Sequence, residues 1–183
     1  MKLIFLDIDG VLNTVDDFFE TSYYGHEHNK GNEVISRTKL ALLDSIIEDT
    51  GAKIVISSTW RLHFRNSQIH EMFKARGFKA PRTTIIGKTN DCRIGITSGP
   101  EYFRSREISE FLKERDDVES YVILDDISER WFDESHHDNL IVTDAYGGGL
   151  TYTLAQKAKN ILGRTEEAQK KHDETNRLLE VFV

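Results

Sequence analysis

The chain has 183 residues, of which 38% are hydrophobic and 30% are charged. This composition is typical of a folded globular protein and excludes a disordered or fibrous chain. The 24 basic and 31 acidic residues give a formal net charge of −7. A negative net charge argues against binding of duplex nucleic acid over a long footprint, because neutralising many phosphates needs a broad basic surface.

The length predicts one domain over residues 1–183, with no repeat or linker that divides it. No apolar run approaches the roughly 18 residues of a membrane span. The apolar run at residues 3–6 is broken by Asp7, so it is too short for a signal-peptide core. A single cysteine, Cys92, fits a reducing compartment. We therefore expect a cytoplasmic protein without a membrane partner; the sequence specifies no oligomeric state.

Apolar runs and their spacing predict alternating strands and helices. The runs are continuous, as in parallel strands covered on both faces, and the helical segments carry apolar residues three and four apart. In chain order the predicted elements are a strand at 3–6, a flap at about 13–32, a helix at 34–48, a strand at 54–56, a helix at 68–76, a strand at 84–86, a helix with Ser105 as its N-cap, strands at 121–124 and 140–142, and helices at 150–162 and about 165–180. The pattern predicts an α/β fold with a doubly wound, Rossmann-like parallel sheet and helices on both faces.

Polar side chains follow three of the predicted strands and, in a parallel sheet, meet at one edge. Asp7 and Asp9 follow the first strand, and an extended backbone would point both side chains the same way. Carboxylates that lie close together repel one another unless a cation or a shared proton relieves the repulsion. With Asp125 and Asp126 after the fourth strand, a Mg²⁺ ion is the natural partner.

These segments resemble the haloacid dehalogenase (HAD) superfamily of phosphohydrolases. Four matches carry the resemblance: residues 5–12 (FLDIDGVL), residues 54–57 (IVIS), Arg104 before a helix, and residues 122–126 (VILDD). A narrower resemblance is to the small HAD domains associated with RNA-repair proteins. It is carried by residues 57–61 (SSTWR), 104–108 (RSREI), 142–144 (VTD) and 149–151 (GLT).

The HAD resemblance implies a role for each site residue. Asp7 would be the nucleophile that forms an aspartyl-phosphate, and Asp9 would be the general acid and then the base. Ser57 and neighbouring backbone N–H groups would bind a phosphoryl oxygen, and Arg104 would offset its charge. Mg²⁺ would be held by Asp7, the backbone carbonyl of Asp9, Asp125 and Asp126.

Simpler interpretations stand beside these roles. One alternative is that Asp7 and Asp9 form a turn before Gly10 and take no part in catalysis. Another is that Ser57 and Ser58 cap the segment that follows them. Arg106 and Lys88 compete with Arg104 for the basic role. The aromatic residues at 23–28 can pack as a flap instead of stacking on a base.

The resemblance implies a Mg²⁺-dependent phosphatase, and the gaps between its motifs leave room for a small flap but no cap domain. An open site suits a bulky substrate, so the first expectation is a 3′ or 5′ terminal phosphate of RNA or DNA. Ser58, Arg61 and Tyr24 are the expected substrate-binding residues, Arg61 for an adjacent phosphate and Tyr24 for a base. The alternatives are a nucleoside monophosphate, another small phosphoester, or a phosphate-end binding module without catalysis.

Overall fold

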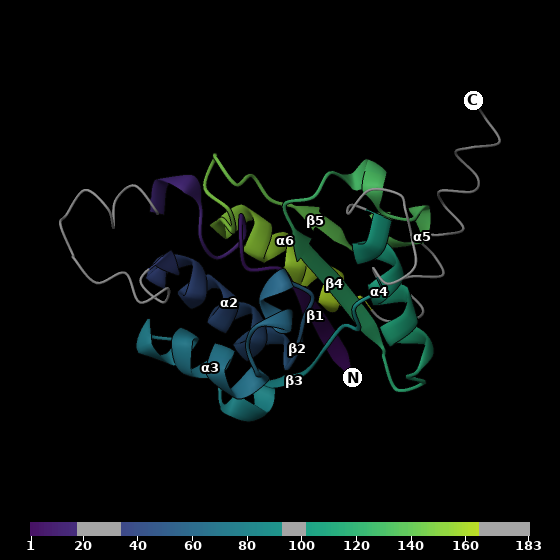
Figure 1. Ribbon diagram of the computed structural model, residues 1–183, viewed down its shortest axis with the longest axis horizontal. Helices are drawn as coiled ribbons and strands as arrows, with labels where there is room; N and C mark the ends of the chain where they lie inside the picture. Colours follow the sequence, from purple (N-terminus) through teal and green to yellow (C-terminus); the bar gives the residue numbers. More distant parts are fainter. Residues whose placement is uncertain (18–33, 93–101, 165–183) are drawn as a thin grey trace.

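The computed structural model describes residues 1–17, 34–92 and 102–164. Within them lies an all-parallel sheet with the strand order β3-β2-β1-β4-β5 (Figure 1). The strands are β1 (Lys2–Leu6), β2 (Lys53–Ile56), β3 (Ile85–Lys88), β4 (Ser120–Asp125) and β5 (Leu140–Val142). The helices are α2 (Arg37–Thr50), α3 (Asn66–Ala75), α4 (Tyr102–Lys113), α5 (Glu134–His137) and α6 (Tyr152–Leu162), with 3-10 turns η2 (Thr59–Leu62), η3 (Arg82–Thr84) and η4 (Glu129–Trp131). The predicted doubly wound α/β fold is confirmed.

Both faces of the sheet are buried, as the continuous apolar strands predict. In the central strand β1, Leu3 and Phe5 belong to the hydrophobic cluster that includes residues of α4, while Ile4 and Leu6 belong to the larger cluster under α2, α3 and α6. All four side chains are fully buried. Phe5 also packs edge-on against Phe111 and Tyr121, with ring centroids 5.6 and 5.9 Å apart.

Two predicted boundaries need correction. Ser105 does not cap α4, because that helix begins at Tyr102 and the buried Ser105 hydroxyl accepts a hydrogen bond from the backbone N–H of Asp133 at 2.9 Å. Residue 84 belongs to the turn η3, and the third strand begins at Ile85. In both cases a contact or turn from the tertiary structure overrides a local preference.

The strand order brings the loops after β1, β2 and β4 together, because the chain winds outward from β1 in one direction and then in the other. Ligands of open α/β sheets bind at such a reversal, beyond the carboxyl ends of the strands. Backbone hydrogen bonds continue past the strands there: the N–H of Asp7 donates to Leu124 and that of Ser57 to Leu6. In the described ranges, no helix is both long and apolar enough to cross a membrane.

We expect Phe5→Ala to lower the free energy of unfolding by about 3–5 kcal/mol, because it removes a buried ring from the middle of the sheet. Urea denaturation measures this loss. Val142→Ala is the control, since Val142 is 41% exposed in the edge strand β5, and its cost should be within about 0.5 kcal/mol. Equal losses in the two variants would contradict the placement of Phe5 in the core.

Candidate active site

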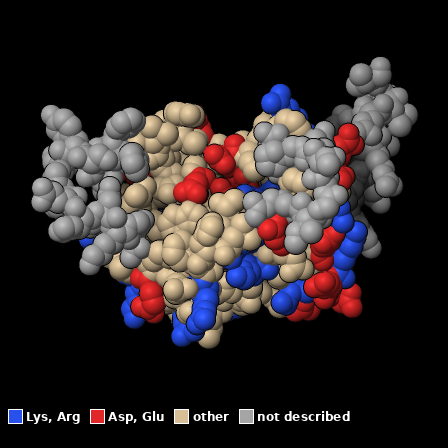
Figure 2. Space-filling model, in the orientation of Figure 1, with Lys and Arg blue, Asp and Glu red and all other residues tan. Residues whose placement is uncertain are grey.

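Three carboxylates meet where β1 and β4 end. One oxygen atom from each of Asp7, Asp125 and Asp126 lies within 4.8 Å of the others. Asp7 and Asp125 are buried and Asp126 is exposed. Acidic side chains are visible near the middle of this face of the molecule (Figure 2). The prediction that acids from the first and fourth motifs come together is confirmed.

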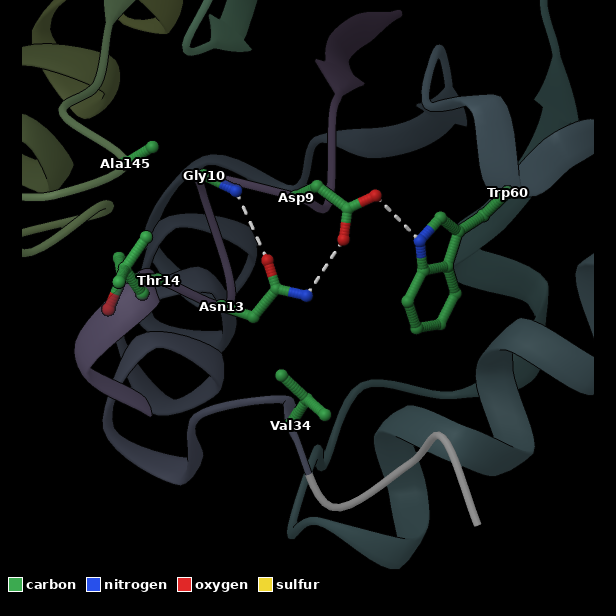
Figure 3. Close-up of a pocket in the computed structure, with 8 residues that line it drawn as sticks. Asp9, Gly10, Asn13, Thr14, Val34, Trp60 and Ala145 are labelled. Atoms are coloured by element: carbon green, nitrogen blue, oxygen red, sulfur yellow. Dashed lines mark hydrogen bonds between the residues drawn. The ribbon is translucent and has the colours of Figure 1, made fainter. Parts of the chain in front are cut away.

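The carboxylate of Asp9 lies outside this cluster and is held by two other side chains. Its Oδ1 accepts a hydrogen bond from Nδ2 of Asn13 at 2.8 Å, and its Oδ2 accepts one from Nε1 of Trp60 at 2.9 Å (Figure 3). The side chain is exposed, whereas that of Asp7 is buried. The two carboxylates thus have different partners, Asn13 and Trp60 for Asp9 and Arg104 for Asp7. The expectation that the two side chains point the same way stays a prediction.

Gly10 forms the turn that directly follows the two acids. Its φ of +75° lies in the left-handed region that glycine tolerates best. A Cβ atom at Gly10 would lie 2.4 Å from Oδ2 of Asp126, so the close approach of this loop to the acidic cluster also requires glycine. The turn is held by the N–H of Gly10 on Oδ1 of Asn13 and by the hydroxyl of Thr143 on the Gly10 carbonyl.

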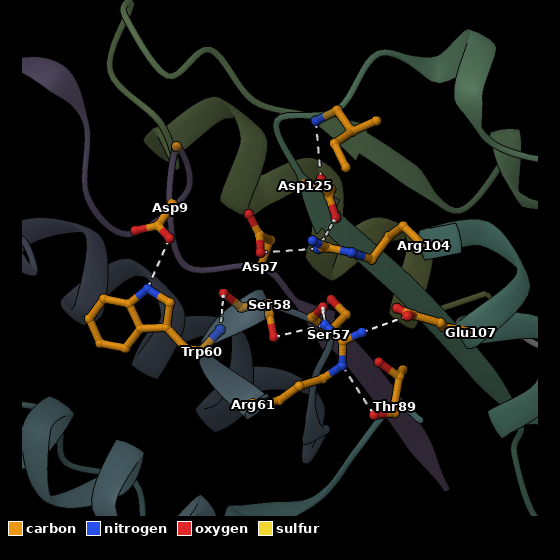
Figure 4. A network of polar contacts seen from close by, with 12 residues as sticks. Asp7, Asp9, Ser57, Ser58, Trp60, Arg61, Thr89, Arg104, Glu107 and Asp125 are labelled. Atoms are coloured by element: carbon orange, nitrogen blue, oxygen red, sulfur yellow. Dashed lines mark hydrogen bonds and ion pairs between the residues drawn. The ribbon is translucent and has the colours of Figure 1, made fainter. Parts of the chain in front are cut away.

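Arg104 lies between two of the buried acids. Its Nη1 is 3.0 Å from Oδ1 of Asp7 and 2.6 Å from Oδ2 of Asp125, and the residue is only 8% exposed (Figure 4). The two rival basic residues are occupied elsewhere: Arg106 pairs with Glu110 on the outside of α4, and Nζ of Lys88 donates to the carbonyl of Arg61. Of the three candidates, Arg104 is the one that contacts the acids.

Burial governs the electrostatics of the site. It raises the pKa of Asp125 to about 7 and raises that of Asp7, even though the charge of Arg104 acts in the opposite direction. Burial would lower the pKa of Arg104, but the charges of Asp125 and Asp7 outweigh it and raise the pKa, so the guanidinium stays protonated. Burial, followed by the charge of Asp7, also raises the pKa of Asp126. The cluster has three carboxylates, and the guanidinium of Arg104 contacts two of them.

The excess of carboxylate oxygens fits a hard divalent cation. Mg²⁺ prefers oxygen ligands and is commonly bound by one or two carboxylates together with substrate phosphate. Asp7, Asp125 and Asp126 are the side chains that could hold it. The carboxylate of Asp9 is not part of this cluster. The ligand expected from Asp9 is its backbone carbonyl, and that stays a prediction.

Ser57 and Ser58 differ in what they can offer a ligand. The hydroxyl of Ser57 is fully buried and has no hydrogen-bond partner among the described residues. The hydroxyl of Ser58 accepts a hydrogen bond from the N–H of Trp60 and caps η2, as the simpler interpretation held. The backbone N–H groups of both serines donate to the carbonyl of Leu6, at 3.0 and 3.3 Å. The sheet already uses these two N–H groups, and the expected phosphate contact through backbone N–H groups that neighbour Ser57 stays a prediction.

Arg61 lies inside the protein, not in the expected position of a substrate-binding fork. It is 3% exposed; its Nη1 donates to the carbonyls of Ser57 and Ser58 at 2.7 and 3.0 Å, and its Nε donates to the carbonyl of Thr89 at 3.2 Å. Its Nη2 is 2.6 Å from Oε1 of Glu107 on α4. These contacts commit the guanidinium to holding the loop after β2 against the helix that carries Arg104. Tyr24, the other expected substrate contact, lies outside the described residues.

Sequence reasoning missed three residues at the site: Asn13, Trp60 and Glu107. Trp60 and Asn13 fix Asp9, and no periodicity predicts that a distant indole donates to it. Glu107 had a detectable signal, because residues three apart on a helix lie on one face, and Arg104 is three residues earlier. A cysteine nucleophile is disfavoured: burial and then Glu110 raise the pKa of the Cys92 thiol to about 11, so the thiol stays protonated.

We expect Glu107→Gln to lower the free energy of unfolding by about 3 kcal/mol, because the buried guanidinium of Arg61 loses a charged partner. Glu110→Gln is the matched control on the same helix. Glu110 pairs with the exposed Arg106, so its loss should be at most about 1 kcal/mol. Urea denaturation of both variants measures the difference. Equal stability of Glu107→Gln and wild type would refute a structural role for the Arg61–Glu107 pair.

The comparisons with known proteins agree with this geometry. A family model described as the HAD domain in Swiss Army Knife RNA repair proteins matches residues 3–155, which contain the whole acidic cluster and all of the sheet except its first residue, Lys2. No curated protein and no solved structure matches the sequence. The match covers well over half of the chain, so the protein belongs to the family of HAD domains found in Swiss Army Knife RNA repair proteins.

Proposed function

We propose that the protein is a Mg²⁺-dependent phosphomonoesterase that removes a terminal phosphate from RNA or DNA through an aspartyl-phosphate on Asp7. The observation that carries the proposal is the buried carboxylate of Asp7, in contact with Arg104 and beside Asp125 and Asp126. A cation and a surplus of acids around one carboxylate suit phosphoryl transfer, where charge stabilisation supplies most of the catalysis.

In the proposed reaction the carboxylate of Asp7 attacks phosphorus, and the bond from phosphorus to the leaving oxygen breaks. Asp9 protonates that oxygen, and then accepts a proton from the water that hydrolyses the aspartyl-phosphate. Arg104 donates to a phosphoryl oxygen, and the unpaired hydroxyl of Ser57 is a second donor. Asn13 and Trp60 orient Asp9 for both proton transfers.

Mg²⁺ would be held by Asp7, Asp125, Asp126 and the backbone carbonyl of Asp9. When bound, it supplies positive charge that offsets the repulsion between the phosphate and the acids. The charge of a divalent cation would add to that of Arg104 and balance the three acids that gather beside this single guanidinium.

The substrate is proposed from the family and from the room at the site. The family takes its name from RNA repair proteins, which favours a nucleic acid as the molecule that carries the phosphate. A small flap over residues 13–32 in place of a cap domain would leave the site open to a polynucleotide end, with Tyr24 and Ser58 near it. A nucleoside monophosphate is the second candidate. A binding module without catalysis needs no nucleophile, and the retained Asp7 argues against it. Cytoplasmic localisation fits the single Cys92.

We expect Asp7→Asn to abolish hydrolysis of p-nitrophenyl phosphate and of phosphorylated oligonucleotides, because an amide does not attack phosphorus. The amide nearly matches the carboxylate in shape, so circular dichroism and urea denaturation should show a folded protein. A substituted protein that retains the wild-type rate would disprove the covalent mechanism.

We expect Asp125→Ala to raise the Mg²⁺ concentration needed for half-maximal activity by at least about ten-fold, because the cation loses a hard oxygen ligand. Titration of Mg²⁺ after treatment with EDTA measures this shift. Asp116→Ala is the control, since Asp116 is exposed between α4 and the start of β4, whereas Asp125 lies at the end of that strand. Wild-type activity that persists in EDTA would exclude the metal requirement.

A further inference from the structure

A cavity of about 380 Å³ opens beside Asp9 (Figure 3). Its volume lies in the range of about 300–1,000 Å³ that is usual for small-molecule sites. Asp9 lines it, whereas Asp7 is not among its lining residues. A phosphoester bound at Asp7 with its leaving oxygen at Asp9 would therefore direct its leaving group toward this cavity.

Apolar side chains and one aromatic ring make up most of the cavity wall: Val15, Val34, Ala145 and Trp60. Trp60 is half-buried, and its ring lies 5.6 Å from that of Phe64, which supports it from one side. A flat aromatic surface in an apolar cavity is suited to stacking against another flat ring.

The polar groups of the wall are largely occupied by one another. Asn13 spans Asp9 and the N–H of Gly10, and the hydroxyl of Thr14 donates to Asp17. No Lys or Arg is among the lining residues that the structure describes. Arg61, the residue expected to bind an adjacent phosphate, is buried against Glu107. The described lining of the cavity therefore suits an uncharged ring and offers no basic side chain to a second phosphate.

We infer that this cavity binds the base of the nucleotide that carries the scissile phosphate, by stacking on Trp60. The inference rests on the proposed phosphatase function. It adds that the protein recognises its substrate by the terminal nucleoside and not by the next phosphate along the strand. Stacking tolerates any base, because every base has a π face. Trp60 then has two roles, since its Nε1 orients Asp9 while its ring receives the base.

The kinetic test compares substrates with and without a base. Adenosine 3′- and 5′-monophosphate carry a base, whereas ribose 5-phosphate carries only the sugar and the phosphate. We expect Trp60→Leu to lower kcat/KM for the better adenosine monophosphate about ten-fold more than for ribose 5-phosphate, given the usual strength of stacking. Trp60→Phe keeps a ring but loses the N–H donor, so it should lower both rates and retain most of the preference for a base.

Trp131→Leu is the matched control, because Trp131 lies on η4 and is not among the residues that line the cavity. It should leave the ratio of the two kcat/KM values unchanged. Equal losses on both substrates in Trp60→Leu would overturn the inference and leave the phosphatase proposal intact.

A binding test separates the inference from catalysis. The chain has two tryptophans, so Trp131→Phe leaves Trp60 as the sole tryptophan reporter. We expect adenosine, which has no phosphate, to quench the fluorescence of Trp60 in a saturable way, and Ala145→Phe to remove this saturation by filling the cavity. Absence of saturable quenching would overturn the inference even in an active phosphatase. Saturable quenching in a protein that hydrolyses neither these three phosphoesters nor phosphorylated oligonucleotides would support the base site and refute the proposed function.

Discussion

The contact of one guanidinium with two buried acids is the interaction on which the rest of the site depends. Arg104 bridges Asp7 at the end of β1 and Asp125 at the end of β4, two strands that are neighbours in the sheet. Buried carboxylates are tolerated only when they are paired, neutralised or bound to a metal. Their raised pKa values reflect this burial, so the cluster can accept further positive charge.

A second buried ion pair determines where that guanidinium lies. Arg61 pairs with Glu107 on α4 and also binds the carbonyls of Ser57 and Ser58, so it joins the loop after β2 to the helix that carries Arg104. The pair lies one helical turn from Arg104. Such pairs contribute little net stability over an apolar contact, but breaking one leaves an uncompensated charge. In this protein the pair acts by position, because it fixes the distance between Ser57, which follows β2, and Arg104 on α4.

The two acids that precede the turn at Gly10 lie in different environments. Asp7 is buried with the cation, and Asp9 is exposed and held by Asn13 and Trp60 beside an apolar cavity. As the proposed nucleophile, Asp7 benefits from a site that excludes water, whereas Asp9, proposed to exchange protons with a leaving oxygen and with water, needs access to both. Gly10, which follows both acids, lets the loop approach Asp126 closely.

The sequence by itself determined the parallel sheet and the convergence of its acids, because continuous apolar runs and the residues that follow them are local patterns that fix strand identity. The narrower family assignment was also visible in its motifs and is confirmed. The tertiary structure alone decided that Arg104 and not Arg106 or Lys88 meets the acids, since helix phase depends on packing against the sheet. It also buried Arg61 and placed the carboxylate of Asp9 against Trp60. Those outcomes depend on partners distant in sequence, such as Glu107 and Trp60, and no local pattern specifies which distant side chain a charge will meet.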